Sequence, residues 1–172
     1  MRSSLAAALL SALLLAAPPA AAAEPAKAAS SEEGPGWRAA RWGMTPEQVL
    51  AAFPQEATPI SPPVTLADGN VIAAGIDGHG FEGFSFDVRF LFTAGKLSLV
   101  SLRTPQKKPV EAEAYVKLRD ALEKRWGPPV EETTAKDFID MRQTRWTRGA
   151  TRVDLKYIPG VVALVFYPAP PP

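Results

Sequence analysis

Residues 84–93, with the sequence FSFDVRFLFT, contain the pattern that decides the fold. Phenylalanine or valine occupies positions 84, 86, 88, 90 and 92, and most of the residues between them are polar. A period of two is typical of a β-strand that places one face against a core. Ala94 and Gly95 then predict a turn into a partner strand over residues 97–102. The stretch therefore predicts an antiparallel hairpin with one buried aromatic face.

A second set of strands is predicted toward the C-terminal end. Residues 151–157 alternate between apolar or small side chains and charged ones, which is typical of a strand with one solvated face. Pro159 and Gly160 predict a turn into the apolar residues 161–167, which we expect to form a central strand. Residues 143–147 predict a strand before this hairpin. Short strands are also predicted at 64–66 and 71–76, and the glycine-rich residues 75–83 predict a flexible loop.

A short helix is predicted to begin at Pro46. Thr45 and Gln48 are spaced as a capping box, and proline is favoured at the first helical position. The helix should end at Phe53, because the residue before a proline avoids the α region and Pro54 follows.

A longer helix is predicted over residues 110–126. Tyr115, Leu118, Leu122 and Trp126 recur at helical spacing, and Gly127 is a typical residue just beyond a helix end. We expect all four side chains of this stripe to lie in the core.

Together these elements predict an α+β fold: an antiparallel sheet with two helices packed on one face, in which a helix followed by strands occurs twice. The pattern leaves open whether the two halves are a true duplication. Residues 37–167 are expected to form this single α+β domain. Residues 24–36 are expected to be a disordered linker, and residues 168–172 a proline-rich tail.

Residues 1–23 have the features of a secretory signal peptide. Arg2 precedes a Leu- and Ala-rich run over residues 5–17, and Ala21 and Ala23 suit cleavage before Glu24. The run is shorter than the ~20 residues of a membrane-spanning helix. We therefore expect a periplasmic or secreted protein that is soluble after cleavage near Ala23.

The composition narrows the classes of function. The chain has no cysteine, which excludes disulfides, thiolate metal sites and the acylated cysteine of bacterial lipoproteins. With 19 Lys and Arg against 18 Asp and Glu, it lacks the basic excess of a nucleic-acid-binding protein. The sequence predicts no catalytic residues, no cofactor and no transmembrane segment in the mature chain.

Asp77, His79 and Glu82 are weak candidates for a metal site, because one nitrogen and two oxygen ligands fall in one glycine-rich stretch. His79 is the single histidine, and no serine lies in a Gly-x-Ser-x-Gly motif, which argues against a catalytic triad. Carboxylate chemistry on an envelope polymer remains an alternative, as does a metal-dependent hydrolase.

Arginines near Trp146 suggest an interaction surface, because arginine beside an aromatic ring is common in recognition sites. An alternating strand would divide these arginines between two faces. The candidate residues of this surface are Arg145, Arg148, Arg152, Asp154 and Lys156. Another reading is a small-ligand carrier that uses the aromatic face of Phe84, Phe86, Phe90 and Phe92.

Three motifs carry a resemblance to a known group. Residues 42–49 read WGMTPEQV, residues 126–129 read WGPP, and Trp146-Thr147 precedes an alternating strand. In these motifs the chain resembles a large group of small exported bacterial proteins without assigned activity, which open their first helix with Trp-Gly-Met-Ser/Thr. More distantly it resembles the fold of β-lactamase inhibitory protein and of small outer-membrane assembly lipoproteins. That resemblance implies binding rather than catalysis, and the missing cysteine departs from the lipoproteins.

The leading expectation is a non-enzymatic binding or interaction protein of the cell envelope, with another envelope protein as its partner.

Overall fold

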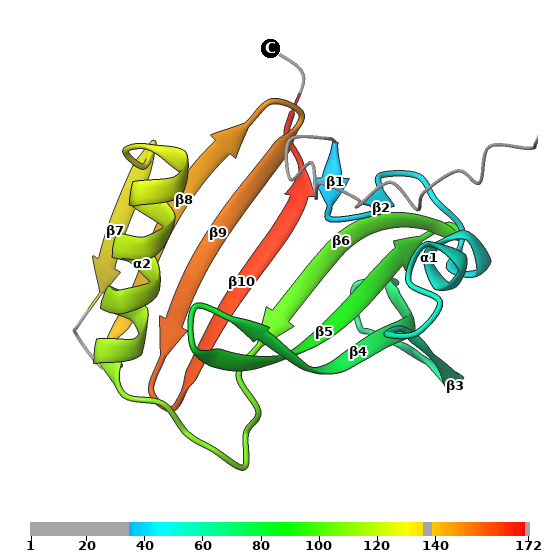
Figure 1. Cartoon of the computed structure of the whole chain (residues 1–172), viewed down its shortest axis with the longest axis horizontal. Helices are drawn as coiled ribbons and strands as arrows, with labels where there is room; N and C mark the ends of the chain where they lie inside the picture. Colours follow the sequence, from blue (N-terminus) through cyan, green and yellow to red (C-terminus); the bar gives the residue numbers. More distant parts are fainter. Residues whose placement is uncertain (1–34, 136–138, 171–172) are drawn as a thin grey trace, which may run out of the picture.

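The computed structural model describes residues 35–135 and 139–170. The predicted signal peptide and residues 24–34 of the predicted linker lie outside the described residues. The described chain forms an eight-stranded antiparallel sheet in the order β3-β4-β5-β6-β10-β9-β8-β7, and a separate two-stranded sheet of β1 and β2 (Figure 1). Two helices, α1 (Pro46–Ala52) and α2 (Ala112–Trp126), accompany them.

The strands are β1 (Gly36–Trp37), β2 (Ala40–Arg41), β3 (Thr58–Thr65), β4 (Val71–Phe81), β5 (Phe84–Thr93), β6 (Lys96–Arg103), β7 (Glu131–Ala135), β8 (Met141–Arg148), β9 (Thr151–Ile158) and β10 (Val161–Pro168).

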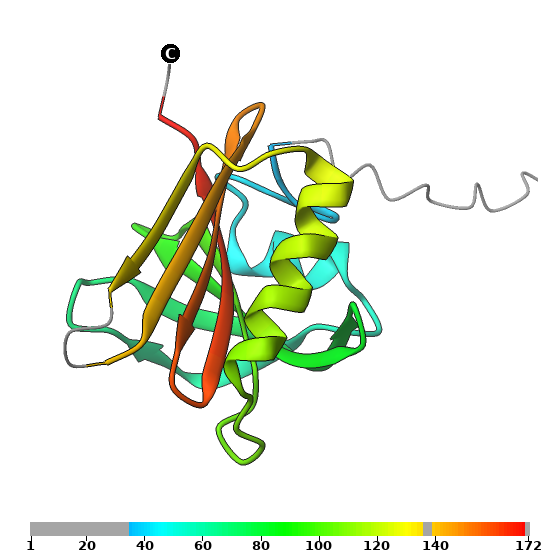
Figure 2. The ribbon, with the colours of Figure 1, turned by 90° about the vertical axis from the view of Figure 1, so that its left-hand side faces the viewer.

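The large sheet consists of two four-stranded meanders that meet at β6 and β10. Strands β3 to β6 follow in chain order, and β7 to β10 follow in reverse from the other edge. The two meanders join through antiparallel pairs such as Leu102 with Leu164. Helix α2 and the segment that carries β1, β2 and α1 lie on the same side of this twisted sheet (Figures 1 and 2).

The predicted α+β class is wrong, because the structure is mostly β: the two helices lie on one side of the sheet, but they supply few of the buried side chains. Helix α1 has 7 residues and contributes one buried side chain, Val49, whereas α2 has 15 residues and contributes four. Most of the buried apolar side chains come from strands. Each helix does precede four strands, but the helices are accessories to a large sheet.

Strands that the sequence analysis does not predict in full explain the wrong fold class. The sequence predicts only a short strand at 64–66 in this region, yet residues 58–65, which read TPISPPVT, all belong to β3. This is an edge strand, where proline is tolerated because it interrupts no central ladder of hydrogen bonds. Glu131–Ala135 forms the other edge, β7, with every residue exposed and thus no apolar alternation to reveal it. The expected flexible loop at 75–83 is instead the end of β4, and the hairpin turn lies at Glu82 and Gly83.

Local signals placed the helix ends well. The capping box is confirmed: the Gln48 amide N–H lies 3.4 Å from the Thr45 hydroxyl, and the Thr45 amide donates to Gln48 Oε1 at 2.9 Å. Helix α2 begins two residues later than predicted and ends at Trp126. Gly127 then adopts a φ of 83°, a conformation that glycine takes readily.

The sheet has two distinct faces. We call the face toward α2 the inner face; on β9 and β10 it carries Val153, Leu155, Leu164 and Phe166, all buried. The opposite, outer face carries the residues between them, among which Asp154 is buried despite its charge. The inner face is therefore the core side of the sheet.

Candidate functional site: a cavity on the inner face

The short strand β1 is held against the inner face near the start of β9. The Gly36 amide donates to the hydroxyl of Thr151 at 3.1 Å, and the Trp42 indole N–H lies 3.3 Å from the same oxygen. A Cβ on Gly36 would lie 1.9 Å from the carbonyl oxygen of Ala40, so only glycine fits between β1 and β2. This arrangement fixes Trp37 and Arg38 above the sheet.

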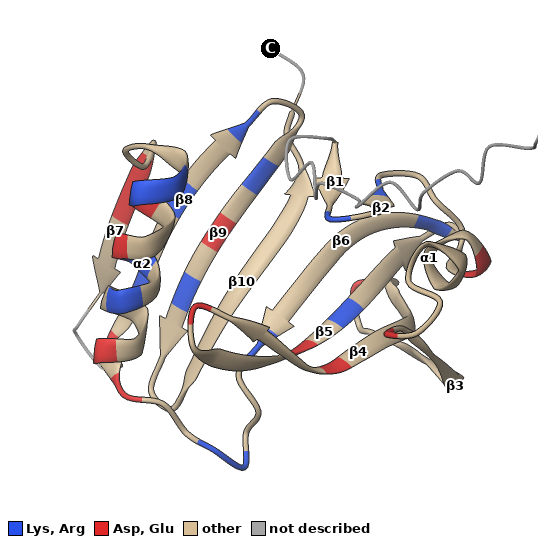
Figure 3. Cartoon of the chain, in the orientation of Figure 1, with Lys and Arg blue, Asp and Glu red and all other residues tan. Residues whose placement is uncertain are grey.

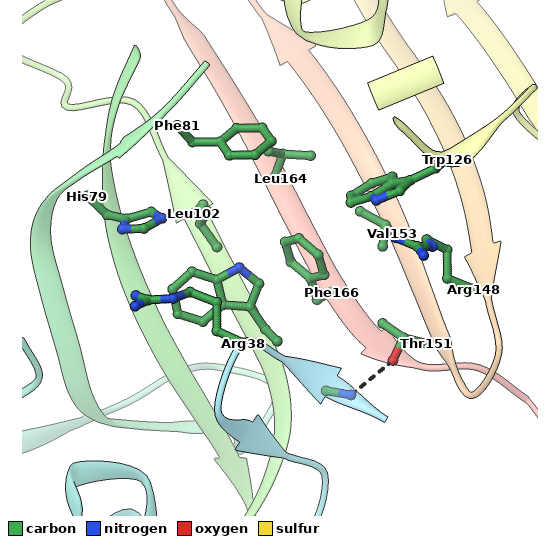
Figure 4. A pocket seen from close by; sticks show the side chains of 12 residues that line it. Arg38, His79, Phe81, Leu102, Trp126, Arg148, Thr151, Val153, Leu164 and Phe166 are labelled. Atoms are coloured by element: carbon green, nitrogen blue, oxygen red, sulfur yellow. Dashed lines mark hydrogen bonds between the residues drawn. The ribbon is translucent and has the colours of Figure 1, made fainter. Parts of the chain in front are cut away.

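A cavity lies between β1, the end of α2 and the inner face of the sheet (Figure 4). It encloses about 50 Å³, and its volume is about 560 Å³ when the open mouth is included. A water molecule needs roughly 10–15 Å³ by such a measure, so the enclosed part suits one compact apolar group. The lining residues come from both meanders and from the two segments above them: Gly36, Trp37, Arg38, His79, Phe81, Leu102, Trp126, Arg148, Thr151, Val153, Leu164 and Phe166.

Aromatic rings build the walls of the cavity. The Trp37 ring centroid lies 5.9 Å from that of Phe90 and 6.5 Å from that of Phe166. On the opposite side, Trp126 makes edge contacts with Trp146 at 6.0 Å and with Phe166 at 6.4 Å. These contacts anchor the walls in the core and leave a preformed apolar recess between them.

Trp126 differs from its predicted role. The helical stripe predicted a core side chain, but Trp126 is only half-buried and faces the cavity. Its Nε1 atom is buried and has no hydrogen-bond partner among the described residues, whereas Nε1 of Trp146 donates to the carbonyl oxygen of Gly127. A buried indole N–H without an acceptor costs roughly 1–3 kcal/mol. The unsatisfied donor therefore lies in the wall of the cavity.

Three guanidinium groups lie over the aromatic walls. The Cζ atom of Arg38 lies 5.3 Å from the centroid of Trp37, and that of Arg148 lies 5.2 Å from the centroid of Trp126. Arg125 lies 5.7 Å from the centroid of Phe81. Such distances are in the range of cation–π contacts. In Figure 4, Arg38 and Arg148 stand at opposite ends of the cavity.

His79 lies beside Arg38 and makes an edge contact with the Trp37 ring, at 5.3 Å between centroids. Burial lowers the pKa of His79, the positive charge of Arg38 lowers it further, and Glu56 opposes this shift. Glu56 itself binds Arg38 through two hydrogen bonds of 2.7 and 2.8 Å, and these bonds lower its own pKa. The imidazole is therefore neutral at pH 7 and presents a polar edge to the cavity.

The structure does not gather Asp77, His79 and Glu82. Asp77 is exposed and pairs with Arg89 at 2.8 Å, and Glu82 lies in the exposed turn after β4. Over residues 35–135 and 139–170, no group of three His, Asp or Glu side chains is placed to hold a metal ion.

The predicted interaction residues divide between the two faces of the sheet. Arg148 lies on the inner face and lines the cavity. The other four, Arg145, Arg152, Asp154 and Lys156, lie together on the outer face, where β9 carries a basic, an acidic and a basic position in turn (Figure 3).

These outer residues form a network around one buried carboxylate, and we call it the Asp154 network. The Asp154 side chain is 2% exposed and accepts hydrogen bonds from Nε of Arg145 at 2.8 Å and from the hydroxyl of Tyr167 at 3.1 Å. Lys156 and Arg152 lie 3.8 and 3.9 Å from its oxygens, and Arg145 also binds Glu131. Burial raises the pKa of Tyr167 to about 12, helped by the negative charge of Asp154 and the hydrogen bond to it. The Asp154 carboxylate is thus fully partnered, although the buried Nε atom of Arg152 has no hydrogen-bond partner among the described residues.

The aromatic face suggested for a ligand carrier is filled core. Phe86, Phe90 and Phe92 are at most 1% exposed, and Phe84 is half-buried. The space for a ligand lies instead beyond these rings, under Trp37 and Trp126. Sequence reasoning missed this cavity because its lining comes from six strands and a helix. Gly36, in the predicted linker, is the residue that brings its upper wall into place.

Comparisons with known proteins give little beyond this description. No family model matches the chain, and no curated protein matches it. Among solved structures, the chain is similar to a DUF4309 family protein (YjgB) from Bacillus subtilis subsp. subtilis strain 168, at 16% sequence identity and a TM-score of 0.38. The similarity covers 73% of this chain and 78% of that chain.

The search for membrane-spanning helices gives a negative result for the described residues: neither α1 nor α2 is long and apolar enough to cross a membrane.

Proposed function

We propose that this is a non-enzymatic binding protein of the cell envelope, and that the cavity on the inner face seats an apolar side chain of a protein partner. The observation that carries the proposal is a preformed recess with aromatic walls that opens to solvent. Residues 1–23 support export to the periplasm or beyond, because they have the charge and apolar pattern of a signal peptide.

The size of the cavity favours a side chain over a large ligand. The enclosed volume of about 50 Å³ is well below the roughly 150 Å³ of a cavity that holds benzene, so it suits the tip of one apolar side chain, and the wider mouth suits the rest of that residue. Aromatic side chains that fill such pockets supply much of the affinity at protein interfaces. A small-ligand carrier is the second candidate, because the open mouth of the cavity gives a small apolar compound the same access.

A titration with simple ring compounds tests the proposal. The neutral peptide Ac-Gly-Phe-Gly-NH₂ should shift the indole N–H signals of Trp37 and Trp126 in ¹H–¹⁵N spectra of the purified protein. Benzyl alcohol provides a free ring without a peptide. Binding of the peptide supports a protein partner, whereas binding of the free ring alone favours a carrier and contradicts the leading proposal.

A cavity-filling variant provides the control for this titration. Leu164→Phe adds volume at the floor of the cavity and should abolish the shifts. Val165→Phe places the same change on the outer face, one residue along β10, and should leave them intact. Melting temperatures of both variants establish that each is folded. The proposal is contradicted if the peptide produces no shift at millimolar concentration, or if Leu164→Phe binds like the wild type.

A further inference from the structure

We propose that pH controls binding to the cavity through His79: protonation of this imidazole drives out the apolar side chain that the cavity seats. This inference rests on the proposed function and adds its regulation. It is carried by the place of His79 in the wall of the cavity, by the contacts of its ring and by the charges that face it.

His79 adds a titratable ring to a wall whose other side chains are uncharged or permanently charged. It belongs to β4, its backbone position pairs with Phe86 of β5, and its ring plane stands at 82° to that of Trp37. The other ionisable lining residues are Arg38 and Arg148, whose guanidinium groups keep their charge throughout the ordinary pH range. His79 is therefore the lining side chain whose charge changes near neutral pH.

The imidazole depends on solvent for its hydrogen bonds. The described part of the chain supplies neither a donor nor an acceptor to its two ring nitrogens, and the side chain is only half-buried. The cavity opens to solvent, so an apolar side chain that enters it displaces water from the wall that His79 helps to form. Loss of this hydration costs the charged form of the ring more than the neutral form. The occupied cavity therefore favours a neutral His79, and a bound proton opposes entry of the apolar side chain.

Two charged groups act on His79 from the segments above the sheet. Arg38 lies in the turn between β1 and β2, and Glu56 follows α1. Burial lowers the pKa of His79, Arg38 lowers it further, and Glu56 raises it to a smaller extent. Glu56 accepts two hydrogen bonds from the Arg38 guanidinium, at 2.7 and 2.8 Å. Burial and the nearby charges together favour the neutral ring, which is the form that the occupied cavity requires.

The strands and helix around His79 do not counteract this preference. On β4 itself, Asp77 is exposed and pairs with an arginine of β5 at 2.8 Å. At the end of α2, the guanidinium of Arg125 lies 5.7 Å from the ring centroid of Phe81, two residues along β4 from His79. Among the described residues, Glu56 is the carboxylate whose charge acts on the imidazole. A proton on His79 is therefore not held in place by an ion pair of its own.

A titration of peptide affinity against pH tests the inference. The peptide Ac-Gly-Phe-Gly-NH₂ has no titratable group, so a change in its affinity with pH must come from the protein. The affinity should be nearly constant above pH 6.5 and should weaken about threefold between pH 7 and pH 5, because binding displaces a proton from His79.

His79→Gln is the matched variant for this titration. Glutamine keeps a polar side chain at the same position but takes up no proton in this range. The variant should therefore bind the peptide with the same affinity at pH 7 and pH 5. Melting temperatures at both pH values establish that the variant and the wild type are folded.

The histidine signal provides a readout that does not depend on affinity. His79 is the single histidine of the sequence, so the imidazole Cε1–H resonance of the untagged protein is assigned without ambiguity. Saturation with the peptide should lower the pH at which this resonance titrates. The reason is reciprocity: if a proton weakens peptide binding, the peptide weakens proton binding by the same factor.

The outcomes separate this inference from the proposed function. Equal affinity at pH 7 and pH 5, at a site that Leu164→Phe blocks, overturns the control by pH and leaves the binding function standing. The inference is also contradicted if His79→Gln loses affinity as the wild type does, or if the His79 resonance titrates at the same pH with and without peptide. Failure of the peptide to bind at either pH overturns the two together.

Discussion

The two faces of strands β9 and β10 both place arginine beside an aromatic ring, and they use it differently. On the outer face, Arg152 lies 4.4 Å from the ring centroid of Tyr167, and both surround the buried carboxylate of Asp154. On the inner face, Arg148 lies over Trp126 at the edge of a cavity lined mainly by apolar and aromatic side chains. The comparison teaches that residue types alone do not mark a binding site: the outer cluster closes around its own carboxylate, whereas the inner pair borders a cavity that is open to solvent.

The largest effect should come from removing the centre of the Asp154 network. Asp154→Ala would remove the acceptor of Arg145 Nε and of the Tyr167 hydroxyl, and it should lower the free energy of unfolding by about 3 kcal/mol. This loss of stability is at the low end of the range for broken buried ion pairs, because the Arg145 side chain is 26% exposed.

Urea denaturation measures this effect, with Arg148→Gln as the matched change on the inner face. That variant should lose less, about 1 kcal/mol at most, because Arg148 is only half-buried and contributes a cation–π contact rather than the acceptor at the centre of a buried cluster. Similar losses in both variants would abolish the distinction between the two faces.

A smaller effect is expected at the wall of the cavity. Gly36→Ala forces a Cβ into the carbonyl of Ala40 and should displace β1, at a cost of about 1–3 kcal/mol, typical of overpacking. The displaced Trp37 should then lose its contacts with Phe90 and Phe166, which a red shift of tryptophan fluorescence would reveal.

Gly80→Ala is the control for that substitution, because nothing lies within 4 Å of a Cβ at that position. Its emission spectrum and stability should match the wild type closely. If Gly36→Ala behaves in the same way, β1 does not hold the upper wall.

Much of the local structure could be predicted from the sequence. Thr45 to Gln48 encode a helix start through hydrogen bonds within four residues, and Gly127 encodes a helix end. A few neighbouring residues are therefore enough to predict both ends. The alternation of residues 84–93 likewise identifies β5, because burial of one face imposes a period of two. These sequence signals are local, and the start of α1, the end of α2 and the strand β5 agree with them.

The remainder depends on contacts between distant segments. The edge strands β3 and β7 bury little, so neither has an apolar period. The prediction includes only the end of β3, at residues 64–66, and no part of β7, so it understates the sheet and gives the wrong fold class. The position of Trp126 on the apolar stripe of α2 predicts that its side chain faces the sheet. It does not predict that a cavity lies beside that side chain. The lining of that cavity is set by the meeting of β4, β6, β9 and β10 with β1, which no single stretch encodes.

The smallest effect should appear in the pH dependence of stability. The pKa of His79 is lower in the folded protein than its ordinary value of 6.5, so the unfolded chain binds a proton first as the pH falls. The contribution of neutral His79 to stability is therefore complete above pH 6.5 and is lost as the pH falls below that value.

Melting temperatures between pH 7.5 and 5.5 should show this loss in the wild type and not in His79→Gln. The window lies above the range in which Glu56 and the other carboxylates take up protons. A wild type with the same pH profile as His79→Gln would mean that His79 is not buried against Trp37.

The central claim is that the inner cavity, and not the basic outer face, is the binding site. The most direct measurement is a map of backbone and indole ¹H–¹⁵N shifts on titration with the peptide Ac-Gly-Phe-Gly-NH₂. The account predicts shifts at Trp37, Trp126 and Phe166, with none around Asp154 and Lys156. Shifts confined to the outer face of β8, β9 and β10 would contradict it.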